Sequence, residues 1–471
     1  MTYQDRQTKY GGYITILVLV FAGVFFVVVS SLSGYIFIQN KVQFSKENRE
    51  KAGAIAEAGL DYYKWFLAHF PDDLQDGTGA SGPYEHTYND PESGEIGTFS
   101  LDVEGNTQCG VVTSIDITST GWTSDDTSLT RVIFGRYAHP SVAEYAYIVN
   151  GNVWAGEDRT IMGRYHSNGG IRMDGENQSL VESAVASWTC TATFDCDPDS
   201  TEDGIFGVGP NSHLWDFPVA QIDFAGITAD LSTMKTLAGS GGIYLGDSGA
   251  YGYHVVFQSD GTLDVYRVDS AGNGDWGYSS QWGWEQEYNT ILSETFLQSY
   301  TPPADCSLVF VEDKLWIEGT VKGKITIASA DLVNANIETD IIIEGDINYS
   351  TLAGTDGLTV IAEEDILIPA VSPNDLSIRG IFIAQTGHFG RNYYDAAEEY
   401  NPDDAYKNSL TISGTIVSNG RVGTKWNCNG VYCSGYNTRN SSYDRTQAKD
   451  PPPLTPYTSD DFNFIEWREE L

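Results

Sequence analysis

The stretch Leu315-Trp-Ile-Glu-Gly-Thr-Val321 returns three times further along the chain in altered form. The other copies are Ile341-Ile-Ile-Glu-Gly-Asp-Ile347, Leu376-Ser-Ile-Arg-Gly-Ile-Phe382 and Leu410-Thr-Ile-Ser-Gly-Thr-Ile416. Each copy has a short apolar run, a glycine at the same offset and a second run that favours a strand. In a solenoid of stacked rungs, glycine permits the corner and adjacent rungs bury each other's inward side chains. The repeat therefore predicts a right-handed parallel β-helix, and its irregular spacing keeps a β-sandwich open as the alternative.

We place this repeat in a β-helix-like domain over residues 141–440. Tyr147–Val153 and His166–Met173 look like earlier rungs of the same coil, because each again joins a strand-like run to a glycine. Gly252–Val268 is typical of an inserted hairpin, with Asp260-Gly261 at its turn. The domain is therefore expected to be a mainly β structure that carries an insertion.

The flanking regions have different patterns. Residues 71–140 contain three segments in which apolar and polar residues alternate, and that period of two predicts a small antiparallel sheet. Residues 441–471 contain the run Asp450-Pro-Pro-Pro453 and predict an extended, Pro-rich tail. Residues 13–70 favour one long helix, since Ile55, Leu60 and their neighbours recur at three- and four-residue spacing.

The first part of that helix has the composition of a membrane span. No charged residue occurs between Tyr10 and Asn40, and residues 14–38 are dominated by Ile, Leu, Val and Phe. About 20 such residues in a helix cross a bilayer. A cleavable secretory signal is the alternative, with a cut near Ser33 and Gly34. Basic residues are more numerous after the span than before it, but long domains translocate largely regardless of loop charge.

Composition limits the partners of the remaining chain. Twenty-six Lys and Arg stand against 65 Asp and Glu among 471 residues, a formal net charge of -39. Nucleic acids and anionic lipids need a basic footprint, so this balance argues against both as main partners. Apolar residues make up 41% and aromatic residues 13%, which is too much for a disordered chain.

The six cysteines indicate an oxidising compartment. Cys190 and Cys196 form one close pair and Cys428 and Cys433 another, each in a loop rich in polar residues and glycine. No histidine stands at ligand spacing around them, so local disulfides are preferred over a zinc site or free thiols. Cys109 and Cys306 can pair with each other or remain free. These cysteines support an extracellular location.

Two groups of residues are candidates for binding or chemistry. Asp195, Asp197 and Asp199 alternate in one loop, a pattern that can direct oxygen atoms to Ca²⁺, although a solvated acidic loop gives the same pattern. His388 and Arg391, with the acidic run Glu363-Glu364-Asp365, are consistent with a polysaccharide lyase or hydrolase. Acidic residues are so common here that the second pattern is weak. No nucleophile elbow, phosphate-binding loop or dinucleotide motif occurs, so no enzyme activity is expected.

Two short motifs carry a resemblance to a known family. Gly11-Gly12-Tyr13 stands directly before the apolar run, and Ala54-Ile-Ala-Glu-Ala-Gly59 ends the helical pattern. Together they resemble the class III leader and the helix element, here Ala56-Glu57-Ala58-Gly59, of PilX-type minor pilins of type IV pili. The rung phrases and the Pro-rich tail are similar to long β-rich proteins with such an N-terminus, so the resemblance covers most of the chain. It implies that residues 1–12 are a leader, cut between Gly12 and Tyr13 by prepilin peptidase.

One position departs from the family pattern. Major pilins carry Glu at the fifth mature position, where it neutralises the terminal ammonium group of a neighbour. Counted from Tyr13, that position is Leu17. An unpaired charge in an apolar filament interior is costly, so the missing Glu fits a subunit at the filament tip. It fits equally a membrane protein that never enters a filament.

These observations predict a non-enzymatic surface or pilus component. The expected role is filament assembly, priming or adhesion, with other pilins, the assembly machinery and a surface glycan as partners. The expected location is a single membrane span with the large domain outside the cell. The alternative is a membrane-anchored extracellular β-helix that binds or cleaves polysaccharide. Prepilin-peptidase and pilus-ATPase genes beside this one would favour the first reading.

Overall fold

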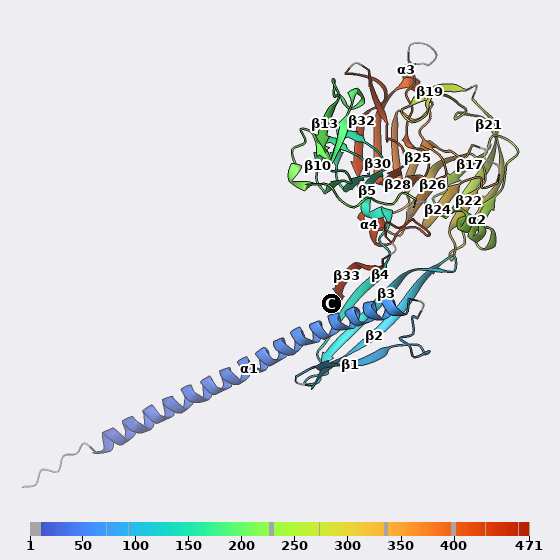
Figure 1. The fold of residues 1–471 in the computed structure, drawn as a ribbon. Helices are drawn as coiled ribbons and strands as arrows, with labels where there is room; N and C mark the ends of the chain where they lie inside the picture. Colours follow the sequence, from blue (N-terminus) through green and yellow to red (C-terminus); the bar gives the residue numbers. More distant parts are fainter. Residues whose placement is uncertain are drawn as a thin grey trace, which may run out of the picture. The chain divides into compact units, whose positions relative to one another are not determined.

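The chain divides into two compact units in a computed structural model (Figure 1). The structure describes residues 11–71, 73–92, 94–225, 230–272, 274–333, 338–396, 402–428, 430–459 and 461–470. Unit 1 comprises Met1–Glu104, Asp116–Arg136 and Glu466–Leu471, and unit 2 comprises Gly105–Ile115 and Tyr137–Ile465. Most of the expected leader, residues 1–10, lies outside the described residues.

Unit 1 contains one long helix and most of a five-stranded sheet. The elements are α1 (Gly11–His69), β1 (Tyr84–Asp90), β2 (Gly94–Gln108), β3 (Val111–Thr123), β4 (Thr130–Ala138) and β33 (Asn463–Glu470). The sheet has the order β1-β2-β3-β4-β33, and β1 pairs with β2 in antiparallel fashion. Ile117, Ser119 and Gly121 of β3 are buried while the residues between them are partly exposed. This alternation is the period of a strand with one covered face.

The first part of unit 2 is built from short strands and turns. Its elements are η1 (Val142–Glu144), β5 (Tyr145–Val149), β6 (Val153–Ala155), β7 (Thr160–Ile161), β8 (Arg164–Ser167), β9 (Ile171–Met173), β10 (Glu176–Asn177), β11 (Val181–Ser183), β12 (Ser187–Cys190), η2 (Ala192–Phe194), β13 (Ser200–Asp203), β14 (Ile205–Phe206), η3 (Ser212–Leu214) and β15 (Trp215–Asp216). Strands β5, β8, β11 and β15 pair in parallel, one after another.

The second part of unit 2 has longer strands. Its elements are α2 (Leu231–Ser240), β16 (Ile243–Leu245), β17 (Tyr253–Phe257), β18 (Leu263–Ala271), β19 (Asp275–Ser279), β20 (Gly283–Glu287), β21 (Ile291–Tyr300), β22 (Leu308–Val311), β23 (Leu315–Val321), β24 (Lys324–Ser329), β25 (Ile341–Tyr349), β26 (Gly357–Ala362), β27 (Ile366–Leu367), β28 (Asp375–Ala384), β29 (Phe389–Gly390), α3 (Pro402–Ala405), β30 (Tyr406–Ser418), β31 (Lys425–Cys428), β32 (Val431–Ser442) and α4 (Arg445–Lys449).

The four repeat phrases lie in β23, β25, β28 and β30, and successive phrases pair in parallel. Leu376 stands opposite Leu410, and Gly380 opposite Gly414. Gly414 has a φ of +134°, and a Cβ atom there would lie 2.0 Å from the carbonyl oxygen of Gly380. Glycine is therefore required both by the backbone conformation and by the closeness of the neighbouring strand.

The interior of the parallel-paired region is filled with aliphatic side chains. Ile317, Ile343 and Ile378 are fully buried in one continuous cluster that runs through unit 2. Strand β17 also joins this region, pairing in parallel with β23. On its other side β17 pairs antiparallel with β18, and this is the hairpin expected around Asp260-Gly261. Burial of apolar area, at about 25 cal/mol per Å², is the main stabilising contribution of such a core.

The coarse prediction is confirmed: the chain is mainly β, with a long apolar N-terminal helix and an antiparallel sheet. The C-terminal region differs from the extended tail that the prolines predicted. It contains the short helix α4 and the strand β33, which is the neighbour of β4 in the sheet. Phe464, Ile465 and Trp467 favour a strand, and this preference outweighs the effect of the preceding prolines.

Candidate functional site

The first half of α1 is an apolar rod without protein cover. Among the described residues, one helix is long and apolar enough to span a membrane, with a mean hydropathy of 2.7 in its best window and no burial there. Tyr13 is 82% exposed and Leu17 53%. Gly12 and Tyr13, the expected cleavage pair, lie in the first turn of this helix. A surface of this kind needs lipid or other apolar helices around it.

The second half of α1 lies on the sheet of unit 1 through its smallest residues. Ala52 and Ala56 are fully buried, while Glu57 of the Ala-Glu-Ala-Gly element is exposed and Ala58 partly so. A Cβ atom on Gly59 would lie 2.3 Å from the hydroxyl of Ser119.

The sheet also approaches the helix closely at one glycine. A Cβ atom on Gly121 of β3 would lie 2.4 Å from the carbonyl oxygen of Ala52 and 2.5 Å from the amide nitrogen of Ala56. The two backbones are therefore in direct contact. This contact explains the small residues of the element Ala56-Glu57-Ala58-Gly59, because larger side chains at Ala56 or Gly59 would separate helix and sheet.

All six cysteines are paired. Cys190 joins Cys196, Cys428 joins Cys433, and Cys109 joins Cys306. The first two pairs close loops with sequence separations of 6 and 5 residues, whereas the third has a separation of 197. The sequence left the third pair open, because spacing alone does not bring residues so far apart together.

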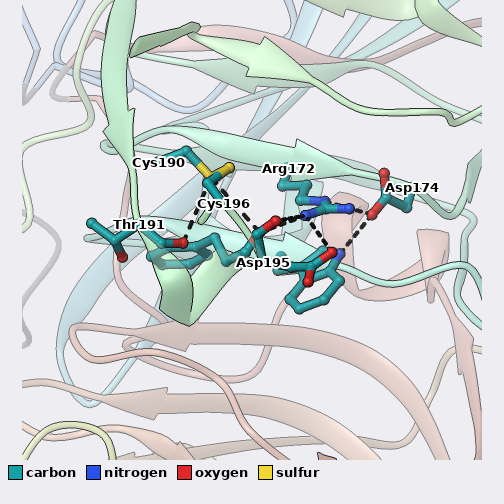
Figure 2. Close-up of a disulfide and its surroundings, with 8 residues drawn as sticks. Arg172, Asp174, Cys190, Thr191, Asp195 and Cys196 are labelled. Carbon is teal, nitrogen blue, oxygen red and sulfur yellow. Dashed lines mark hydrogen bonds and ion pairs between the residues drawn. A yellow bond between two sulfur atoms is a disulfide. The ribbon is translucent and has the colours of Figure 1, made fainter. Parts of the chain in front are cut away.

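The loop closed by Cys190 and Cys196 is held by Arg172 (Figure 2). The Arg172 guanidinium donates to the Asp174 carboxylate at 2.7 Å and to the Phe194 carbonyl oxygen at 2.6 Å. It also forms an ion pair with Asp195 at 3.2 Å and lies over the ring of Trp154 at 4.5 Å. One arginine thus connects the disulfide loop to strand β9 and to an aromatic ring.

The calcium interpretation gains no support from this geometry. Asp195 is paired with Arg172, and Asp197 and Asp199 are exposed. In the described part of the chain, no three His, Cys, Asp or Glu side chains are grouped so that they could hold a metal ion. The alternating carboxylates belong to a solvated loop.

His388 and Asp365 belong to a stack of residues at one corner of unit 2. Lys314, Asp340, Asp365 and His388 each precede a strand, and the backbones of successive rungs are hydrogen-bonded there at 2.9–3.0 Å. Asp365 Oδ1 lies 2.8 Å from His388 Nδ1, and Asp340 accepts from the Asp365 amide at 2.9 Å.

The corner stack is buried and its charges are matched internally. Burial, together with the nearby carboxylates Glu338 and Asp365, raises the pKa of Asp340 well above its usual range. Burial opposes protonation of His388, but the Asp365 carboxylate outweighs it and raises the pKa of the imidazole. Glu363 is used to cap backbone and hydroxyl groups, accepting from the amide of Asp331 at 3.0 Å. The arrangement is that of a hydrogen-bonded stack rather than an open acid–base pair.

A pocket of about 290 Å³ lies at the His388 end of this stack. Its lining includes the charged and aromatic side chains of Trp154, Asp158, Arg391, Arg421, Lys425, Trp426 and Arg439. Sequence reasoning singled out His388 and Arg391 but missed the others, which come from β6, β31, β32 and two loops. One feature of the sequence indicates a basic site: Arg421, Lys425 and Arg439 are close together in a chain with few basic residues.

Comparisons with known proteins include a weak likeness to a solved structure. Neither a protein-family model nor a curated protein sequence matches this chain. Among solved structures, the competence-associated pilin ComZ from Thermus thermophilus aligns with 90% of this chain and 97% of its own, at 12% identity and a TM-score of 0.30. At that TM-score the two chains share a loose likeness and nothing about function follows from it.

Proposed function

We propose that this chain is a non-enzymatic component of a type IV pilus or a related filament, in the manner of a PilX-type minor pilin. The observation that carries the proposal is the division of α1 into two halves. The half around residues 14–38 is apolar and exposed, while the half from Ala52 onward is packed on a small sheet. Such a helix suits a subunit that is stored in a membrane and then packs against the helices of other subunits.

The division has a simple energetic meaning. Exposed apolar area costs about 25 cal/mol per Å² in water, so the first half of α1 is stable only in lipid or in a bundle of similar helices. The second half is already packed against the sheet of unit 1. Leu17 adds no charge to the bundle, which suits a tip or priming position better than one inside the filament shaft.

For unit 2 we propose a right-handed parallel β-helix displayed at the cell surface. The successive parallel pairs β24–β26, β26–β28, β28–β30 and β30–β5 support this fold. The disulfide-bonded loops support an oxidising, extracellular environment. No catalytic role is proposed for His388 and Asp365, which form an ion pair inside the corner stack.

N-terminal processing tests the pilus proposal. The full chain is expressed in a host with prepilin peptidase and, as the control, in the same host without it. In the first host, sequencing of the mature N-terminus is expected to give Tyr13-Ile-Thr-Ile, and in the second the leader is expected to remain. An unprocessed Met1 in the peptidase-positive host, or a start near residue 35, would overturn the proposal. The first result would favour the alternative of an ordinary membrane-anchored β-helix, and the second a secretory signal.

A further inference from the structure

The pocket at the end of the corner stack has walls that are fixed by disulfide bonds. Thr193 lies in the loop closed by Cys190 and Cys196. Lys425 and Trp426 lie on β31, and the Cys428–Cys433 bond closes the hairpin between β31 and β32. Preformed walls are typical of ligand sites, because little conformational freedom is lost when a ligand binds.

The charge of this pocket is opposite to that of the chain. Arg391, Arg421, Lys425 and Arg439 line it, and among its described lining residues Asp158 is the one carboxylate. Asp158 accepts from Lys425 at 2.9 Å and from Arg439 at 2.7 Å. Burial opposes ionisation of Asp158, but these two partners outweigh it and lower its pKa to about 2. Lys425 and Arg439 therefore share one carboxylate, which offsets one of their two positive charges.

Among the described residues, neither Arg421 nor Arg391 forms an ion pair with a carboxylate, although Glu287 is near enough to favour the charged form of Arg391. In the described part of the chain no carboxylate pairs with Arg421, whose guanidinium lies over the Phe194 ring at 4.9 Å. Arg391 is completely buried, and its Nε and Nη1 groups have no hydrogen-bond acceptor. Burial lowers the pKa of both guanidinium groups. Buried donors without acceptors are unfavourable, and an anion in the pocket would lie close to the positive charge of Arg391, which lines it.

Aromatic rings form the other part of the pocket and continue beyond it. Trp154 and Trp426 both line it. Trp426 contacts Tyr278 of the β19–β20 hairpin, with 5.8 Å between ring centroids, and Tyr278 contacts Trp284 at 5.6 Å. Trp282 and Trp284 of this hairpin are about half exposed. The partly exposed rings of Trp282 and Trp284 are suited to contact with the apolar faces of sugar rings.

We propose that this pocket binds a uronic acid residue of an anionic polysaccharide, with the neighbouring sugars lying along the hairpin rings. Guanidinium groups bind carboxylates through two parallel hydrogen bonds, which fits Arg421, a lining residue that no carboxylate of the described chain pairs with. A volume of about 290 Å³ suits a single sugar ring rather than a long polymer segment. A nucleic acid fits less well, because its phosphates would run over a surface with a formal net charge of -39.

The proposal does not depend on the pilus function, since binding is measured on purified chain whether or not a leader has been removed. Full-length protein in detergent is titrated with oligomers of galacturonate, of mannuronate and of hyaluronan, and binding is followed by calorimetry and tryptophan fluorescence. Saturable binding of at least one uronate oligomer is expected, together with no binding of neutral galactose or glucose oligomers of equal length.

Two charge-removing variants identify the site. Arg421→Gln is expected to weaken uronate binding about tenfold or more, because a charged hydrogen-bond partner is lost from a desolvated site. Arg445→Gln, which removes a charge on α4, is the matched control and is expected to bind like the unaltered chain. Circular dichroism establishes that both variants are folded. The binding readout separates a ligand contact from a structural role, since a folded Arg421→Gln chain with unaltered affinity excludes the contact.

Three outcomes would overturn the proposal. These are the absence of saturable binding to every uronate oligomer, equal binding of charged and neutral oligomers, and an affinity that Arg421→Gln does not change. A further titration uses a thymidine oligonucleotide. If that oligonucleotide binds with dependence on Arg421 and the uronates do not, the ligand is a nucleic acid and the assignment to a saccharide is wrong.

Discussion

Units 1 and 2 exclude water by opposite means. In unit 1, helix α1 meets the sheet through alanine and glycine, so that a Cβ atom on Gly121 would lie 2.4 Å from the Ala52 carbonyl oxygen. In unit 2, the interior is filled by large aliphatic side chains, with Ile317 and Ile343 fully buried. In unit 1 the backbones of helix and sheet touch at Gly121, and Ile55, Leu60 and Tyr63 are buried along the same helix. In unit 2 side chains fill the space between strands throughout.

The difference determines which changes each unit tolerates. A close backbone contact has no room for added atoms, so unit 1 is sensitive to larger side chains. The interior of unit 2 is already filled. Unit 2 is therefore destabilised by the loss of side-chain volume and, most of all, by a buried charge. The same type of substitution is therefore expected to have different effects in the two units.

The largest effect is expected from a charge in the interior of unit 2. Ile343→Asp places a carboxylate without a partner at a fully buried position and is expected to reduce the free energy of unfolding by about 4 kcal/mol or more. The matched control, Ile343→Val, removes one methylene group and should cost only about 0.5–1.5 kcal/mol. Thermal unfolding followed by circular dichroism measures both. An unchanged melting temperature for Ile343→Asp would show that this side chain does not point inward.

A smaller effect is expected from overfilling the contact in unit 1. Gly121→Val adds atoms that meet the backbone of α1, and overpacking of this kind costs about 1–3 kcal/mol. The measurement is hydrogen exchange of amides in residues 48–69, which should lose protection while unit 2 does not.

Gly53→Ala is the control for that experiment. Gly53 lies on the same helix but has no atom within 4 Å of the added Cβ position. Alanine there is expected to stabilise the helix by up to about 1 kcal/mol. Equal protection in Gly53→Ala and Gly121→Val would mean that α1 and β3 are not in close contact.

The smallest effect is expected at the partly buried Glu344 of unit 2. Burial, with a contribution from the nearby carboxylates of Glu318 and Glu294 and against the effect of His254, raises the pKa of Glu344 to about 7. Its Oε2 atom has no hydrogen-bond partner. The pKa of Glu344 is higher in the folded chain than in the unfolded chain, so ionisation of Glu344 destabilises the fold. This destabilisation is absent below the unfolded value of 4.5 and grows as the pH rises from there to about 7.

Glu344→Gln is therefore expected to flatten the pH dependence of unfolding. The variant should be about 1–2 kcal/mol more stable than the unaltered chain at about pH 8 and similar to it near pH 4, after allowance for solvent screening. Glu157→Gln, at an exposed carboxylate, is the control. Urea unfolding across this pH range measures the difference. A stability gain that is the same at both ends of the range would contradict an elevated pKa.

The features that the sequence predicts well are local ones. The repeat glycines, such as Gly414, are visible because each stands at a fixed offset within its own rung. The pairs Cys190–Cys196 and Cys428–Cys433 lie close in sequence, and the apolar run of α1 is continuous. The paired cysteines and the apolar run are close along the chain, and each repeat glycine is recognisable within its own rung without knowledge of the rung beside it.

The features that were missed depend on residues far apart in the chain. Trp154 and Trp426 line one pocket, although almost the whole of unit 2 separates them in sequence. Cys109 reaches Cys306 in the same way. Strand β33 was missed because its partner β4 is distant and prolines precede it. Periodicity and spacing carry no information about such contacts, since only the packed fold brings the partners together.

The position of β33 has a consequence for how this molecule can change over evolutionary time. The chain leaves the small sheet after β4, forms the main segment of unit 2, and returns as β33, the neighbour of β4. The two ends of the intervening segment therefore start from adjacent strands, the arrangement in which a domain inserted into another is best tolerated. A lineage could shorten, enlarge or replace this insert between two adjacent strands, provided that Cys109 in the β2–β3 turn keeps or loses its disulfide partner Cys306 at the same time. The same helix and sheet would then carry different inserted domains in different descendants.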